Sequence, residues 1–194
     1  TLFNTLTAGG AHANDQLFAT LVTRTREWNL ARGLTVMLSD TVGFVRDLPH
    51  DLVASFRATL EEATHADLLL IVLDVSDPMA ELQYETVQST LKELFESVRL
   101  SEEKEGFVWT PPEVIVLLNK ADRLNDNSAL LIWERTIPNS IPFCALRSDA
   151  LGHEELTRRV ADLARGQVRE LWIRLPMSEG KAITTIENRA EVLD

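Results

Sequence analysis

The sequence predicts a three-layer α/β domain with a mostly parallel sheet. Two nearly continuous aliphatic runs, Asp67–Val75 and Val114–Leu118, are typical of strands that are covered on both faces. Segments with helical periodicity separate the expected strands, and strands that alternate with helices form parallel sheets with right-handed crossovers. The 194 residues, 45% of them hydrophobic and 25% charged, suffice for one such domain and exclude wholesale disorder.

The remaining elements follow from local patterns in chain order. Thr1–Leu6 has the apolar spacing of a short helix, Leu34–Ser39 reads as a strand, and apolar residues at i+3 and i+4 predict a helix over Asp51–Ala63. Ala80–Val98 is expected to form a long helix that turns Leu82 inward. The last expected elements are a helix over Ser128–Arg135, a strand over Ile141–Cys144 and a helix over Leu151–Ala164.

Composition and charge narrow the range of functions. One cysteine excludes a disulfide scaffold and a multi-cysteine metal site. The net charge of −11 argues against unaided wrapping of nucleic acid, and the acidic run from Asp77 to Glu105 is interpreted as the solvated face of a helix. No apolar run approaches the length of a membrane helix, and no signal segment opens the sequence. We therefore expect a cytoplasmic protein.

A tetrapeptide directly after the second buried strand, Asn119-Lys120-Ala121-Asp122, is the strongest candidate for a binding site. The Asp122 carboxylate can accept hydrogen bonds from both N1–H and the exocyclic amine of guanine, a donor pair that adenine lacks. A wrong base would leave this carboxylate unpaired, which gives discrimination on the order of 10⁴. Asn119 would hold the loop together, and the stem of Lys120 would pack over the base. The alternative is an ordinary turn that begins a helix.

A second candidate, Asp40-Thr41-Val42-Gly43, follows the strand over residues 34–39. The Asp40 carboxylate is a hard oxygen ligand that can hold Mg²⁺ through water. Gly43 lets its backbone N–H approach a terminal phosphate without obstruction by a side chain. Taken alone, the tetrapeptide fits a simple turn better, but the Asn-Lys-x-Asp motif downstream favours a phosphate site.

These two motifs, on alternating strands, look like those of a P-loop GTPase. The stretches over Asp15–Leu21 and Ser39–Pro78 closely resemble the HflX family of ribosome-associated GTPases, and the similarity covers most of Thr1–Gly166. The resemblance implies a GTPase domain over residues 1–166 and a linker with the start of a small C-terminal domain over 167–194. It further implies GTP and GDP as ligands, Mg²⁺ as cofactor and hydrolysis of GTP to GDP and phosphate.

The resemblance also implies a partner. HflX-type proteins associate with the 50S ribosomal subunit in ribosome rescue or splitting, so the same association is expected of this chain. The chain is expected to act as a monomer without membrane or DNA partners.

The family pattern assigns roles to a segment near the N-terminus. Thr20 corresponds to the switch I threonine, which coordinates Mg²⁺ and, together with Gly43, serves the terminal phosphate. From the residues alone, Thr23 or Thr25 would be equally good candidates. Arg24 and Arg26 could contact phosphate or ribosomal RNA, but they are interpreted as solvated charges of the same loop. The switch I residues expected to contact the ligand are Phe18, Ala19, Thr20, Leu21 and Val22.

The family pattern also implies a base-contacting loop. Cys144, Ala145 and Leu146 fall where the family usually has Ser-Ala-x, a loop whose backbone contacts the base. Backbone donation survives the replacement of serine by cysteine. A role for Cys144 as a small buried core residue is equally compatible with the sequence.

The sequence departs from the superfamily pattern in two places. Many relatives have a glutamine after the switch II glycine that orients the attacking water, whereas this sequence has Phe44, so slow intrinsic hydrolysis is expected. The phosphate-binding motif G-x-x-x-x-G-K-[ST] is absent. Thr1-Leu2-Phe3-Asn4 matches what the family places directly after that motif. We therefore expect that the sequence starts just past the P-loop and that residues 1–194 alone are inactive.

Three other functions fit parts of the sequence. The chain could be another translation- or RNA-associated GTPase with related motifs. It could also be a non-enzymatic interaction module that kept the fold and lost nucleotide binding. An adenine-nucleotide enzyme would require that the Asp122 carboxylate point away from the base.

Overall fold

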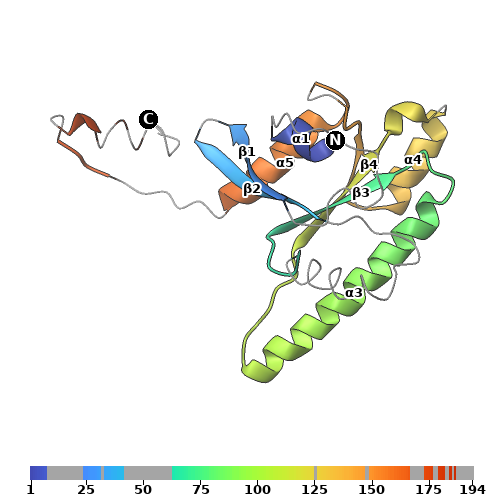
Figure 1. Cartoon of the computed structure of the whole chain (residues 1–194), viewed down its shortest axis with the longest axis horizontal. Helices are drawn as coiled ribbons and strands as arrows, with labels where there is room; N and C mark the ends of the chain where they lie inside the picture. Colours follow the sequence, from blue (N-terminus) through green and yellow to red (C-terminus); the bar gives the residue numbers. More distant parts are fainter. Residues whose placement is uncertain are drawn as a thin grey trace.

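The computed structural model shows a three-stranded parallel sheet and a separate two-stranded hairpin, with helices packed against them (Figure 1). The parallel sheet has the order β3 (Leu68–Asp74), β4 (Glu113–Asn119), β5 (Ser140–Phe143). The helices α3 (Ala80–Glu105) and α5 (His153–Gly166) lie on opposite sides of these strands. This arrangement confirms the predicted α/β class. The structure describes residues 1–7, 24–31, 33–41, 63–124, 126–146, 149–166, 173–176, 179–181, 184 and 186.

The central strand β4, Glu113–Asn119, organises the core because it is covered on both faces, as its aliphatic run predicts. Ile115 and Leu117 point into a cluster on the side of α1 (Leu2–Leu6) and α5 (His153–Gly166). Val116 and Leu118 point into a cluster on the side of α3 and α4. All four side chains are at most 2% exposed. The helices α3 (Ala80–Glu105) and α4 (Asn127–Thr136) cover the cluster that contains Val116 and Leu118.

The neighbouring strand β3, Leu68–Asp74, is less covered than its sequence predicts. It pairs in parallel with β4, with Leu69 opposite Val114. The expectation of a strand buried on both faces is wrong at Val72, which is 46% exposed. The reason is that β3 forms an edge of the sheet among the described strands, so helices cover its flank incompletely.

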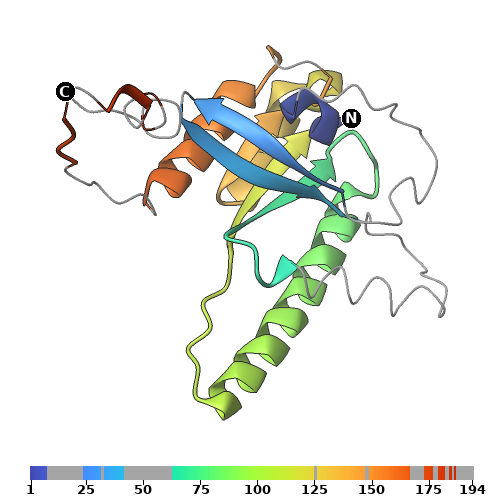
Figure 2. The same cartoon turned by 60° about the vertical axis from the view of Figure 1, so that its left-hand side comes forward.

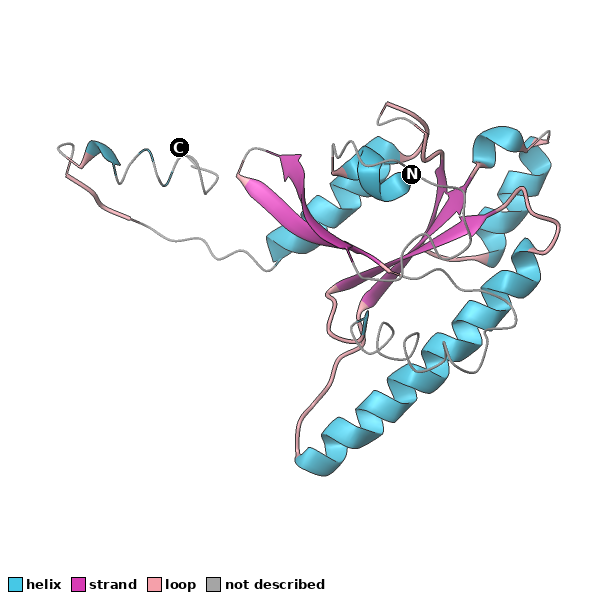
Figure 3. Ribbon diagram, viewed as in Figure 1, coloured by secondary structure: helices cyan, strands magenta, loops and turns pink. Residues whose placement is uncertain are grey.

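The hairpin of β1 (Arg24–Ala31) and β2 (Leu34–Asp40) contains the main difference from the predicted fold (Figure 3). The strand at Leu34–Asp40 is confirmed, but Arg24 and Arg26 lie in a strand and not in a loop. Charged residues hid this strand, because its first four side chains, from Arg24 to Glu27, are all exposed. Trp28, which is 4% exposed, and the partly buried Leu30 pack against the core.

The long helix α3 continues past its predicted end at Val98 to Glu105 and projects beyond the sheet (Figure 2). It ends at Gly106, whose φ of 84° lies in the left-handed region that glycine tolerates best. The prediction that Leu82 faces inward is wrong, since this side chain is 43% exposed. The acidic side chains of α3 form its solvated face, and Arg99 bonds to two of them, Glu96 and Glu103.

The C-terminal half of the described domain follows the prediction closely. α4 covers the expected range, and the carboxylate of Asp126 caps its first turn by accepting from the backbone N–H of Ser128 at 2.8 Å. The short strand β5, Ser140–Phe143, pairs in parallel with β4, and α5 packs Leu156 fully into the core. Of the helices in the described part of the chain, none combines the length and the apolar character needed to span a bilayer.

Candidate functional site

The carboxyl ends of the three parallel strands lie level with one another. Asp74 at the end of β3 is opposite Asn119 at the end of β4, and Asn119 is opposite Phe143 at the end of β5. The pairing continues for one residue, because the backbone N–H of Val75 donates to the Asn119 carbonyl at 3.1 Å. The polar residues that follow these strands therefore share one rim of the sheet, where ligands of parallel α/β sheets bind.

The turn after β4 presents the predicted tetrapeptide on this rim. Lys120 has a φ of 60°, a left-handed conformation that is uncommon for a residue with a side chain. This conformation turns the chain at once into the single 3₁₀ turn η1, Ala121–Arg123. Ala121 is buried, and the backbone N–H of Arg123 closes the turn on the Lys120 carbonyl at 2.9 Å.

Asp122 is exposed on the first turn after β4. Within the described part of the chain, its carboxylate forms no hydrogen bond or ion pair with a protein group. Both of its oxygens are thus open to a ligand. A carboxylate with two open oxygens can accept from two donors at once.

Asn119 joins this turn to the loop after β5. Its Oδ1 accepts a hydrogen bond from the backbone N–H of Ala145 at 3.2 Å. Cys144 and Ala145 are buried, whereas Leu146 is 69% exposed. The structure therefore brings together the two segments that were predicted separately, Asn119–Asp122 and Cys144–Leu146. The burial of Cys144 also agrees with its interpretation as a small core residue.

Asp74 belongs to the same rim and was missed in the sequence. Its Oδ2 lies 2.5 Å from the Nζ of Lys120, and its Oδ1 accepts hydrogen bonds from the Ser76 backbone N–H and hydroxyl. The bridge stretches the Lys120 side chain between the ends of β3 and β4. A signal was available, because Asp74 ends a buried strand in the same way as Asp40 ends β2.

Partial burial would by itself raise the pKa of Asp74, but the hydrogen bond from Lys120 and those from Ser76 outweigh it and lower the pKa below its ordinary value. The carboxylate therefore stabilises the folded chain above the ordinary value of 3.8, and this stabilisation disappears as the pH falls through the lowered pKa.

We expect Asp74→Asn to lower the free energy of unfolding by about 1 kcal/mol or less at pH 7, since the ion pair is partly solvated. The difference between the variant and the wild type should vanish at an acid pH below the lowered pKa of Asp74, where the carboxyl is neutral. Denaturant titrations at both pH values measure this difference. If the two proteins differ in their free energy of unfolding by the same amount at both pH values, the ion pair makes no contribution.

The predicted metal and phosphate residues are not gathered at this rim in the described structure. Asp40 ends β2, which belongs to the hairpin and does not pair with β3 among the described strands, and Thr41 after it is exposed. Asp40 is half-buried and remains suited to Mg²⁺ by the chemistry of its oxygens. Across the described residues, no three His, Cys, Asp or Glu side chains are clustered to hold a metal. Further predicted residues lie outside the described ranges: Phe18, Ala19, Thr20, Leu21, Val22, Val42 and Gly43.

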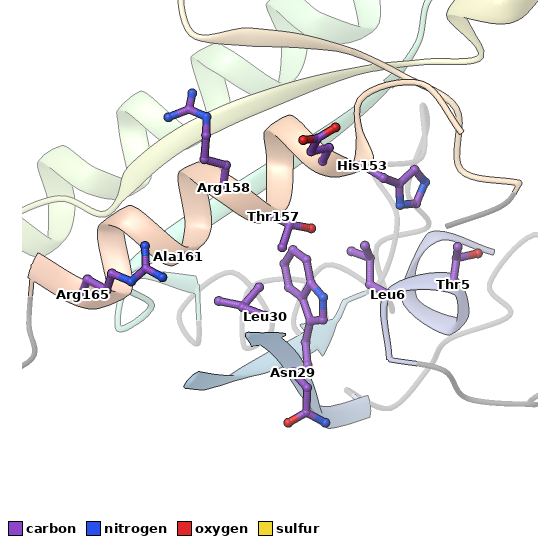
Figure 4. A pocket seen from close by; sticks show the side chains of 11 residues that line it. Thr5, Leu6, Asn29, Leu30, His153, Thr157, Arg158, Ala161 and Arg165 are labelled. Atoms are coloured by element: carbon purple, nitrogen blue, oxygen red, sulfur yellow. The ribbon is translucent and has the colours of Figure 1, made fainter. Parts of the chain in front are cut away.

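Two cavities among the described residues lie away from Asp122. One of about 560 Å³ opens between α1, β1 and α5, where Thr5, Asn29 and Arg165 line it (Figure 4). A second, of about 490 Å³, lies at the start of α5. His153 lines both. Neither contains a residue of the predicted site, so we assign the site from the convergence of polar groups at the strand ends and not from cavity size.

Comparison with known proteins identifies the family of this chain. Residues 1–120 match the family model of the 50S ribosome-binding GTPase. The matched range includes the hairpin, β3, β4 and the first two residues of the Asn119–Asp122 turn. The class of the protein follows: the chain belongs to the 50S ribosome-binding GTPase family.

Its curated relatives define the branch within that class. The chain is 36% identical to GTPase HflX of Magnetococcus marinus over 194 residues, covering all of this chain and 41% of the relative. It is 36% identical to GTPase HflX of Escherichia coli over 182 residues, covering 93% of this chain and 39% of the relative. The chain is thus an HflX-family sequence that spans about two fifths of the length of these relatives.

Solved structures confirm the fold. A variant of SsGBP superposes with a TM-score of 0.57 at 29% identity, over 84% of this chain and 50% of that one. Era from Aquifex aeolicus, in a complex with GDP and AlF₄⁻, superposes with a TM-score of 0.63 at 16% identity, over 90% of this chain and 54% of that one. The second likeness is one of fold alone.

Proposed function

We propose that this chain forms the guanine-recognising part of a GTPase that acts on the 50S ribosomal subunit. The observation that carries the proposal is the exposed Asp122 carboxylate, which has no protein partner in the described structure and stands on a turn fixed by Asn119 and Lys120. A carboxylate held in this way selects guanine over adenine. The family supports the same ligand, GTP or GDP.

The remaining predicted residues would serve the phosphates and the metal. Asp40 and Thr20 would hold Mg²⁺, which would neutralise charge on the phosphates, and the backbone N–H of Gly43 would contact the γ-phosphate. Water would attack the γ-phosphate in line with the leaving oxygen. Because Phe44 can neither donate nor accept a hydrogen bond through its side chain, this water is poorly oriented without a partner.

Titration with guanine and adenine nucleotides tests the proposal. The complete gene product is expected to bind GDP and GTP, and to bind ADP and ATP at least about 10³-fold more weakly. The 194-residue chain is the informative comparison. Since it contains no G-x-x-x-x-G-K-[ST] motif, we expect it to bind either nucleotide far more weakly than the complete product does. Equal affinities for GDP and ADP would contradict the proposal.

Addition of purified 50S subunits tests the proposed partner. We expect slow GTP hydrolysis by the complete product alone and a rate at least about tenfold higher with 50S subunits, which supply the missing orientation of the water. Purified 30S subunits are the matched control and should leave the rate unchanged. A rate that is fast without ribosomes, or equal stimulation by both subunits, would contradict this part of the proposal.

An interaction module that lost nucleotide binding is the second candidate function. The exposed, unpartnered Asp122 argues against it, because nothing in the described structure replaces a ligand there. The same titrations separate the two functions. A complete product that binds 50S subunits and no nucleotide would establish the module.

A further inference from the structure

The loop Cys144–Leu146 is held by side chains from three different elements. The Cys144 carbonyl lies 2.9 Å from Nε2 of His153 on α5. The Ala145 N–H donates to Asn119 at the end of β4, and the Ala145 carbonyl accepts from the Thr5 hydroxyl of α1 at 3.0 Å. From the sequence, Asn119 was assigned only to its own turn and to the base. His153 and Thr5 gave no signal in the sequence, because only the three-dimensional fold brings α5 and α1 to this loop.

The protonation of His153 follows from its partner. A carbonyl oxygen can only accept a hydrogen bond, so Nε2 carries the proton and donates. The imidazole is 5% exposed and its ring centre lies 4.5 Å from that of Phe143, which fixes its orientation. Figure 4 shows His153 at the start of α5, on the side that faces Thr5 and Leu6 of α1.

The contact acts on a buried part of the loop. Cys144 is fixed on both sides, since its N–H donates to the Leu151 carbonyl at 3.0 Å and its carbonyl accepts from His153. Loss of the His153 donor would leave this carbonyl without its partner at a site that is almost closed to water. The loop would then shift, and the shift would also disturb Asn119 through its bond to Ala145.

We propose that His153, supported by Thr5, is a positioning residue that holds the Cys144–Leu146 loop in the conformation that meets the guanine base. This proposal rests on the proposed function for its ligand. Its physical part, the positioning of the loop, does not need a ligand. The two parts can therefore be tested separately.

Alkylation of Cys144 measures the position of the loop without nucleotide. This residue is the one cysteine of the 194-residue chain and is buried, so its thiol reacts only when the loop opens. In His153→Leu, which keeps an apolar side chain against Phe143, we expect alkylation by N-ethylmaleimide to be about tenfold faster, the factor that corresponds to one lost hydrogen bond. His153→Gln offers an amide donor and should restore the rate to within about threefold.

Nucleotide affinity measures the consequence for the ligand. In the complete gene product, His153→Leu should weaken GDP binding about tenfold at unchanged stoichiometry, and His153→Gln should rescue it. Thr5→Val removes the second donor with little change of shape and should weaken GDP binding in the same direction. Val160→Ala, a buried change on the same helix, is the control for a general loss of stability and should leave the affinity and the alkylation rate unchanged.

Each outcome decides one part of the proposal. If the wild type binds no guanine nucleotide, the proposed function falls, while the alkylation rates still decide whether His153 positions the loop. If the wild type binds GDP and His153→Leu moves neither readout, the positioning role is wrong. Faster alkylation with unchanged GDP affinity would overturn the link to the base, and equal effects in Val160→Ala would reduce His153 to a structural residue.

Discussion

Asp122→Asn in the complete gene product is expected to lower the affinity for GTP by about 10²–10⁴-fold and to create affinity for XTP. The amide cannot accept hydrogen bonds from both N1–H and the exocyclic amine of guanine. Xanthine carries a carbonyl in place of that amine and suits the amide donor. Competition titrations with GTP and XTP against a fluorescent nucleotide measure both changes.

The matched control is Glu134→Gln, which neutralises another exposed carboxylate, in the last turn of α4. It should leave the affinity for GTP unchanged, since Glu134 has no place at the strand ends. If Asp122→Asn keeps its preference for GTP over XTP, the carboxylate does not read the base, and the assignment of the site loses its main support.

Gly152→Ala is expected to give the largest loss of stability. Gly152 has a φ of 84°, and a Cβ at this position would lie 2.2 Å from the Pro142 carbonyl oxygen and 2.9 Å from the ring of Phe143. These neighbours are a backbone carbonyl and a fully buried ring, so neither can move away without disturbing the core. We expect the free energy of unfolding to fall by about 2–5 kcal/mol.

Two other glycines separate the causes of this loss. Gly106 has the same φ but no atom within 4 Å of an added Cβ, so Gly106→Ala should cost only about 1–2 kcal/mol of backbone strain. Gly166 lies at the end of α5 with open space around it, and Gly166→Ala should cost almost nothing. Denaturant titrations of the three variants check the order. A loss in Gly152→Ala no larger than in Gly106→Ala would show that the close approach to Pro142 is relieved.

The strands and the central turn could be predicted because their signals are local. β4 is a run of branched aliphatics, and Asn119–Asp122 follows it directly, so the position of the turn on the rim needed only the general rule for parallel sheets. Asp74 obeys the same rule and could have been found with it. The hydrogen bond between Asn119 and Ala145 depends on the pairing of β4 with β5. The alternation of strands and helices predicts that such strands pair in parallel, but it does not predict which residues lie opposite each other.

Other features depend on contacts that no local pattern carries. β1 looks like a charged loop because its first four side chains are all exposed, and the core contacts come from Trp28 and Leu30 near its end. Leu82 fits the apolar stripe of α3 but lies where nothing in the described structure covers it fully. His153 has no spacing to mark it, since its partner Cys144 is brought near by the turn at Gly152.

The position of the base relative to Asp122 is the central claim, and a crystal structure of the complete gene product with GDP measures it most directly. The account predicts that the two carboxylate oxygens of Asp122 lie about 2.7–3.0 Å from N1 and the exocyclic amine of guanine. It also predicts that Lys120 spans one face of the base. A structure in which GDP is bound while the Asp122 carboxylate points into solvent would contradict the account.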